Sequence, residues 1–350
     1  NGRLTRVTTT NAGRKAAGGG DGRRGAEGVA VWFATFDAVS GHLGSDRVAS
    51  SAGLPLERLR IEAQIDADRG SLLQASSVGR AGGVEFQLAV EPGQDLANSG
   101  AGVTGQLGRI PLQTLLAAWP PSIAPAARAY VTKNVKSGTI RQGQIAIGSP
   151  LTEASSTGAA RAPVIVLDAE EIEVAATAAS PQIAIPKATV RIGGNQTVIE
   201  APTVTIGRSP GRVTLQAMEF RAERIHEGTH ASGALSFRLQ SGLKPVAQLI
   251  ASLPNTPLKT SAVNISDVDG KIDARLRLNF PVAQNLALSE VRTEGQLRIS
   301  DGRVRKVFAN HDVSGLKLEA DISDKAIDVN GAFLLAGIPV RITGQHFPNQ

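Results

Sequence analysis

Residues His226-Glu227-Gly228-Thr229-His230 match the HExxH signature of zinc hydrolases. That chemistry needs a helix, on which two histidines four residues apart share one face and the glutamate beside them acts as general base. Gly228 and Thr229 are poor helix formers, and alternating apolar and polar runs flank the motif on both sides. In an extended segment the two histidines lie about 13 Å apart, too far to share one zinc ion. We therefore predict strand, turn and strand here, without a metal site, and keep a zinc hydrolase using His226, Glu227 and His230 as a remote alternative.

A second chemical candidate is SDVDGKID, in which Asp267, Asp269 and Asp273 are spaced like the first ligands of a calcium loop. The glycine required at the sixth position and the glutamate required at the twelfth are absent. We predict an ordinary Asp-Gly hairpin at this point.

Without cysteines the chain has no thiolate ligand or nucleophile. It also has no phosphate-binding loop or serine elbow. The expectation is a protein that is not an enzyme and uses no cofactor.

The strongest pattern in the chain is the alternation of apolar and polar residues between about 263 and 344. In the run from Lys271 to Phe280 the even positions are apolar and the odd positions are Lys, Asp, Arg or Asn. This period of two is typical of a β-strand with one apolar and one polar face. The pattern returns at 316–323 and 338–343. Turn signals at Asp301-Gly302 and Asp324-Lys325 predict an antiparallel meander.

Further alternating runs predict strands through most of the remaining sequence. They cover 29–36, 59–68, 84–90, 140–147, 164–174, 183–192, 198–206, 213–224 and 235–239. One helical hairpin is expected at about 111–136, where Pro120-Pro121 separates two helices and Gly138 follows the second. A short helix is also predicted at 243–253. Residues 1–28, rich in Gly and Arg, are expected to form a weakly ordered edge or loop.

Composition restricts the partners of this chain. Hydrophobic residues make up 41% of it but aromatic residues only 3%, so the apolar faces consist of Val, Ile, Leu and Ala and few bases could stack on them. The net charge of +6 comes from 37 basic and 31 acidic residues. A solvated polar surface explains most of this charge, with attraction to anionic membranes second and nucleic acid a distant third. No apolar run reaches the roughly 20 residues of a membrane helix.

Alternation alone leaves two interpretations of the apolar face. It could line a closed β-sandwich that serves as a scaffold or adhesion module. It could instead form an open groove that takes up hydrocarbon. Each buried methylene contributes about 0.8 kcal/mol, so one sixteen-carbon acyl chain could gain on the order of 10 kcal/mol.

The helical segment supplies a resemblance to a known family. Trp119-Pro120-Pro121, Ala124-Pro125, Ala127-Arg128, Tyr130-Val131, Asn134 and Ser137-Gly138-Thr139-Ile140 resemble a segment of the YhdP-type branch of the AsmA-like superfamily. The closing phrase IDVNGAFLLAGIPVRITG, at 327–344, is similar to the last repeat of the same proteins. Tyr130 departs from the pattern, since Trp is commoner there. The resemblance covers about 29–347.

The resemblance implies a non-enzymatic, bridge-like lipid transfer protein of a Gram-negative envelope. Such a protein is tethered to the inner membrane by an upstream helix, crosses the periplasm, and moves phospholipids toward the outer membrane through a hydrophobic groove. This movement would support outer-membrane integrity. Its partners would be phospholipid acyl chains and the two membranes, with no nucleic acid; the resemblance specifies no protein partner.

The expected fold is therefore mainly β: a long antiparallel, twisted and curved sheet that forms a hydrophobic groove, with a helical hairpin inserted near 111–136. Residues 29–347 would form this groove region. From alternation we assign the groove lining to Ile272, Leu276, Leu278, Phe280, Leu297, Ile299, Leu316, Leu318, Ile322, Ile327, Val329, Ile338, Val340 and Ile342.

Overall fold

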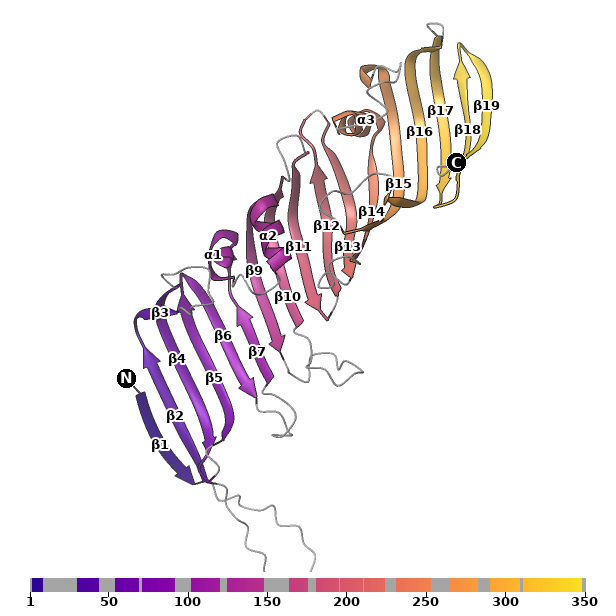
Figure 1. The fold of residues 1–350 in the computed structure, drawn as a ribbon. Helices are drawn as coiled ribbons and strands as arrows, with labels where there is room; N and C mark the ends of the chain where they lie inside the picture. The colour runs from indigo at the N-terminus through magenta and orange to yellow at the C-terminus, as the bar shows by residue number, and fades with distance from the viewer. Residues whose placement is uncertain are drawn as a thin grey trace, which may run out of the picture. The chain divides into compact units, whose positions relative to one another are not determined.

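The computed structural model confirms a mainly β protein with one large antiparallel sheet that is not closed on itself (Figure 1). It describes residues 2–8, 30–43, 54–68, 71–91, 102–119, 125–147, 164–175, 181–194, 196–209, 211–223, 231–252, 265–282, 290–308 and 311–347. The motif at 226–230 and most of the segment 1–28 lie outside these residues. Two compact units divide the chain, 1–121 with 141–166 and 122–140 with 167–350. They are called unit 1 and unit 2 below.

Unit 1 is a meander of antiparallel strands with one helix. It holds β1 Gly2–Thr8, β2 Ala30–Ala38, β3 Gly41–Leu43, β4 Leu54–Asp66, β5 Leu72–Ala81, β6 Val84–Glu91, β7 Gly102–Leu107, β8 Ile110–Pro111 and α1 Leu112–Ala118. β9 (Val135–Ile147) and β10 (Val164–Val174) contribute residues to both units. In unit 1 the second half of β9 pairs with β7. The strand β1, paired with β2, lies inside the segment where the sequence predicts a weakly ordered edge or loop.

Unit 2 contains the longest strands and two helices. Its elements are α2 Pro125–Asn134, β11 Ile183–Gly193, β12 Gln196–Ile206, β13 Val213–Glu223, β14 Ser232–Gly242, α3 Leu243–Ser252, β15 Val268–Pro281, β16 Arg292–Phe308, β17 His311–Ile322, β18 Ile327–Leu335 and β19 Ile338–His346, with a short 3-10 helix η3 at Ile265–Asp267. From β11 to β19 each strand pairs antiparallel with the next one in the chain. This is the meander that the alternation predicts.

Proline and local hydrogen bonds set the limits of the helices. α1 ends at Ala118, before Trp119-Pro120-Pro121, because a residue that precedes proline avoids the helical region. α2 begins at Pro125, where the missing amide hydrogen costs nothing. Its last residue, Asn134, donates a side-chain hydrogen bond of 3.0 Å to the Tyr130 carbonyl. Both helices lie where the sequence predicts them, but β9 begins at Val135, so Gly138 is part of a strand instead of a helix end.

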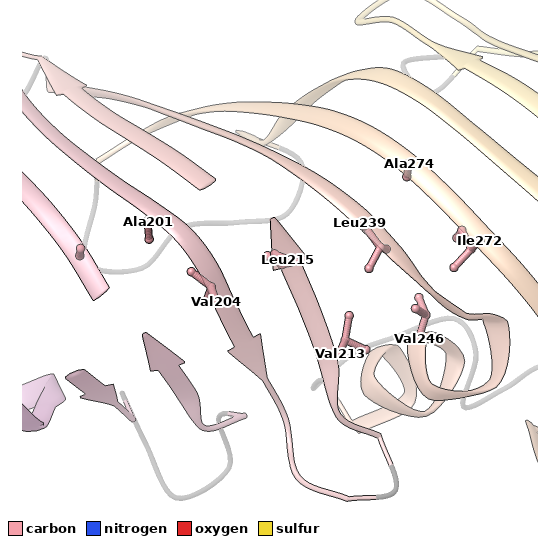
Figure 2. Close-up of a cluster of buried hydrophobic side chains, with 9 residues drawn as sticks. Ala201, Val204, Val213, Leu215, Leu239, Val246, Ile272 and Ala274 are labelled. Atoms are coloured by element: carbon pink, nitrogen blue, oxygen red, sulfur yellow. The ribbon is translucent and has the colours of Figure 1, made fainter. Parts of the chain in front are cut away.

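The core of unit 2 lies between its sheet and α3. Val246 of α3 points toward Val213, Leu239 and Ile272 (Figure 2), and all four side chains are buried. Leu243 and Leu249 of the same helix pack against this cluster. The three leucine and valine positions are spaced by three residues, so they form one apolar stripe along the helix.

The two Asp-Gly pairs do not form the predicted turns. At Asp269-Gly270 and Asp301-Gly302 the strands β15 and β16 continue, and a shift in pairing register shows a β-bulge at each place. Gly270 has φ of 131° and Asp301 has φ of 54°, both in the left-handed region that bulges use. The prediction of turns here was wrong because Asp and Gly serve turns and bulges equally well. Asp324-Lys325, in contrast, does separate β17 from β18.

Candidate functional site

The candidate site in unit 2 is one face of the sheet, defined by residues that lie opposite one another in successive strands. One row across β14 to β19 consists of Leu239, Ala274, Leu297, Ala320, Val329 and Gly344. A neighbouring row consists of Ser241, Ile272, Ile299, Leu318, Gly331 and Ile342. Directly opposed residues project to the same side of a sheet. We call this side the apolar face.

The registers place the fourteen predicted lining residues on the apolar face. Six of them are already in the two rows above, namely Ile272, Leu297, Ile299, Leu318, Val329 and Ile342. A third row joins Leu276 through Gly295 to Ile322 and Ile327. The remaining lining residues, namely Leu278, Phe280, Leu316, Ile338 and Val340, follow by alternation along the same strands. Whether the face forms a groove stays a prediction.

The apolar face also reaches strands that the predicted lining does not include. Leu239 lies opposite Leu215, and Leu215 lies opposite Val204 in β12. Both side chains are buried. The sequence pattern is harder to read in this region because Ala217, with φ of 49°, forms a bulge in β13 and reverses the alternation. Within β18, Phe333 and Leu335 also belong to the face; the unbroken run of apolar residues around them hides their register.

Glycines on the apolar face make room for large side chains of the next strand. The Phe280 ring lies across Gly233, where an added Cβ would come within 2.8 Å of it. The same ring stacks on Phe220, with 6.3 Å between the ring centres. Stacked aromatic rings at this spacing attract each other beyond simple burial. The aromatic pair therefore bridges β13 and β15 across the glycine of β14.

The opposite face carries charge. Its row next to those above runs Arg238, Arg275, Gln296, Asp321, Asp328 and Gln345. Arg238 pairs with Asp273 at 3.0 Å, and Arg298 pairs with Glu319 at 2.9 Å. Hydrogen bonds from Gln240 and Arg238 lower the pKa of the Asp273 carboxyl below its ordinary value of 3.8. These exposed pairs add little to stability but keep this face hydrated.

Over β17, β18 and β19 the apolar face is not covered by any described element. In the described part of the chain these strands make extensive contacts only with neighbouring strands. Leu318, Val329 and Val340 are half-buried by their neighbours, and Ile338 is 66% exposed. Contiguous exposed apolar surface of this kind marks a site that binds a protein, a membrane or an apolar ligand.

Unit 1 repeats the same division into an apolar and a polar face. One row across its sheet is Phe36, Ile61, Ser77, Leu88, Gly105 and Ile145. The adjacent row on the other face is Asp37, Arg60, Val78, Gln87, Gln106 and Gln144. Phe36 is 46% exposed. An apolar face is thus present in each unit.

Among the described residues, no three His, Cys, Asp or Glu side chains gather where they could hold a metal ion. His226, Glu227 and His230 are outside those residues. The described helices include none that is long and apolar enough to cross a bilayer. Asp269 accepts a hydrogen bond of 2.8 Å from the Gly270 amide, an arrangement that belongs to the bulge in β15.

Comparison of the chain with protein-family models, curated proteins and solved structures gives no match.

Proposed function

We propose that this protein binds the acyl chains of phospholipids on its apolar face and carries them, without catalysis, between the inner and outer membranes of a Gram-negative envelope. The observation that supports the proposal is the apolar face of unit 2. Apart from Ser241 in β14, the two rows from β14 to β19 consist of Leu, Ile, Val, Ala and Gly, with no Asp, Glu, Lys or Arg. An acyl chain laid on such a face leaves water without burying a charge.

The size of the gain supports lipid as the cargo. At about 0.8 kcal/mol per buried methylene, a sixteen-carbon chain gains on the order of 10 kcal/mol when fully covered. Strands spaced about 4.8 Å apart give a row of side chains wide enough for extended hydrocarbon. The polar face keeps its ion pairs in water while the apolar face is loaded. Partition onto the face needs neither a metal nor an energy-rich cofactor.

The resemblance to YhdP-type AsmA-like proteins agrees with this proposal and supplies its cellular setting. In that setting the chain lies in the periplasm, tethered by an upstream helix, and supports outer-membrane integrity. The resemblance rests on the segment from Trp119 to Ile140 and on the phrase at 327–344. The apolar face supports the proposal that the protein binds lipid, and the resemblance supports the proposed location in the periplasm.

Native mass spectrometry of the chain purified from a bacterial periplasm, combined with lipid extraction, tests the proposal. We expect copurified phospholipid that is lost in a folded Leu278→Asp variant. Arg277→Asp, one residue away on the polar face, is the matched control and should keep its lipid. A folded, lipid-free wild-type chain would overturn the proposal and favour a scaffold or adhesion role.

Because Leu278→Asp could unfold the sheet, a second measurement uses folded protein only. A photo-crosslinking amino acid at Leu318 should capture phospholipid in the periplasm, whereas the same group at Lys317 should not. The two positions are adjacent in β17 and face opposite sides. Equal capture at both would show that lipid contacts the chain without selecting the apolar face, and would refute the proposal.

A further inference from the structure

One rim of the unit 2 sheet combines basic and exposed apolar side chains. α2 ends beside the end of β10, because the Ala175 amide donates a 2.9 Å hydrogen bond to the Asn134 carbonyl. The turn from β12 to β13 lies beside the start of β11, because the Gly207 amide donates to the Gln182 carbonyl at 2.9 Å. The antiparallel meander therefore brings α2, this turn and α3 to the same rim.

The turn and α3 are in direct contact. A Cβ on Gly211 would come within 3.2 Å of Gln248 Cβ, and one on Gly207 would come within 3.2 Å of Leu249 Cδ1. Gly207 has φ of 87°, so glycine is favoured there for the backbone as well as for space. The turn that carries Arg208 and Arg212 thus lies against α3 at Gln248 and Leu249.

This rim is basic in all three of its parts. Residues 125–136, 207–212 and 243–252 contain six basic residues, namely Arg128, Lys133, Lys136, Arg208, Arg212 and Lys244, and no acidic residue. Acidic side chains near the rim include Glu173, near the end of β10, and Asp267 and Asp269, beside the start of α3. The basic side chains therefore outnumber the acidic ones, and the rim is positively charged.

Apolar side chains are exposed among these charges. Tyr130 in α2 is 59% exposed and Ile250 in α3 is 40% exposed. Tyr is favoured at the boundary between water and lipid, where its ring is buried and its hydroxyl stays hydrated. Basic residues with interspersed apolar tips are the composition of surfaces that lie on anionic bilayers.

We propose that this rim docks unit 2 on the surface of an anionic phospholipid bilayer. We call Arg128, Tyr130, Lys133, Arg208, Arg212 and Ile250 the rim surface. α3 packs on the apolar face with Val246, and Ile250, one turn further along the helix, is 40% exposed, so the docked rim sets the apolar face directly at the membrane. The inference deepens the proposed function by naming where lipid would reach the face.

Sedimentation with vesicles tests the rim directly. At about physiological salt the chain should bind vesicles of phosphatidylcholine that contain 30% phosphatidylglycerol. It should lose most of this binding at about 1 M salt, where the Debye length is only about 3 Å. Each removed charge should weaken binding about five-fold. The triple reversal Lys133→Glu, Arg208→Glu and Arg212→Glu should therefore reduce binding by at least a hundred-fold.

The matched control reverses three charges on the polar face, Arg275→Glu, Arg277→Glu and Lys317→Glu. It changes the net charge equally and should retain most of the binding. Equal losses in the two triple variants, or equal binding to pure phosphatidylcholine vesicles, would refute the rim surface. Circular dichroism of both variants checks that each remains folded.

Native mass spectrometry of the same variants separates this inference from the proposed function. The rim variant should still carry lipid acquired during expression, because its apolar face is unchanged, and should lose only vesicle binding. Wild-type protein that binds vesicles but carries no lipid would overturn the proposed function and leave the rim standing. If the protein carries lipid but the rim variant binds vesicles as well as wild type does, the rim surface is overturned and the proposed function stands.

Discussion

Gly295 in β16 is a residue whose backbone excludes any side chain. Its φ is 141°, and an added Cβ would lie 2.0 Å from the Arg275 carbonyl oxygen. We expect Gly295→Ala to lower the free energy of unfolding by about 2 to 4 kcal/mol, through strain and displacement of β15. Gly344→Ala is the matched control, because nothing lies within 4 Å of its added Cβ. Its effect should stay within about 0.5 kcal/mol in urea denaturation.

Asp273 gives a prediction about pH. Its lowered pKa, caused first by the Gln240 hydrogen bond and then by that of Arg238, means that the folded protein favours the charged carboxylate. The resulting stability is present above the ordinary pKa of 3.8 and is lost as the pH falls through the lower folded value. NMR titration should show the Asp273 pKa rising toward its ordinary value in Gln240→Ala. An unchanged pKa in that variant would remove the hydrogen bond as the main cause.

At the scale of the element, Val246 is the most buried of the three side chains through which α3 packs on the sheet. Val246→Ala should lower the free energy of unfolding by about 2 kcal/mol, because it removes two methyl groups from the cluster with Val213, Leu239 and Ile272. Ile250, one turn further along α3, is 40% exposed, so Ile250→Ala should cost less than half as much. Thermal or urea unfolding of the two variants measures the difference. Equal effects would show that α3 is not anchored through its apolar stripe.

Sequence alternation predicts the strands and their apolar side well because a period of two fixes which side chains share a face. It fails where a bulge inserts a residue, as at Ala217, since the pattern then changes side within one strand. It also cannot tell an Asp-Gly turn from an Asp-Gly bulge, which differ in the partner strands and not in local preference. The extension of the candidate site to Val204, Leu215 and Phe333 required the pairing registers.

The ion pairs and the contacts at the rim also could not be predicted from the sequence. The pairing of Arg298 with Glu319 depends on the register of β16 against β17, and alternation does not fix that register. Likewise the two helices α2 and α3 lie more than a hundred residues apart in the chain, and only the meander brings them to one rim. Propensity predicts each helix, because proline and helical spacing are local signals.

At the scale of the whole molecule, each unit offers an apolar face of its own. A photo-crosslinking group at Ile61 in unit 1 should therefore capture phospholipid, as the group at Leu318 does in unit 2. Arg60, the next residue of β4, projects to the polar face and serves as the control. Mass spectrometry of the crosslinked products gives the result. Capture in unit 2 alone would restrict the lipid-binding surface to that unit.

The bulges of β15, β16 and β17 lie beside one another, and this alignment has a consequence for the evolution of the sheet. A Cβ on Gly270 would be 2.8 Å from the Gly302 Cα, and one on Gly302 would be 2.8 Å from the Leu316 Cβ. Gly315 continues the series with φ of 62°. A one-residue deletion in any single strand would leave its neighbours' extra residues unmatched and reverse the faces beyond that point. Length changes in these three strands should therefore occur together in related sequences, because only matched changes keep the same residues on the apolar face and on the polar face.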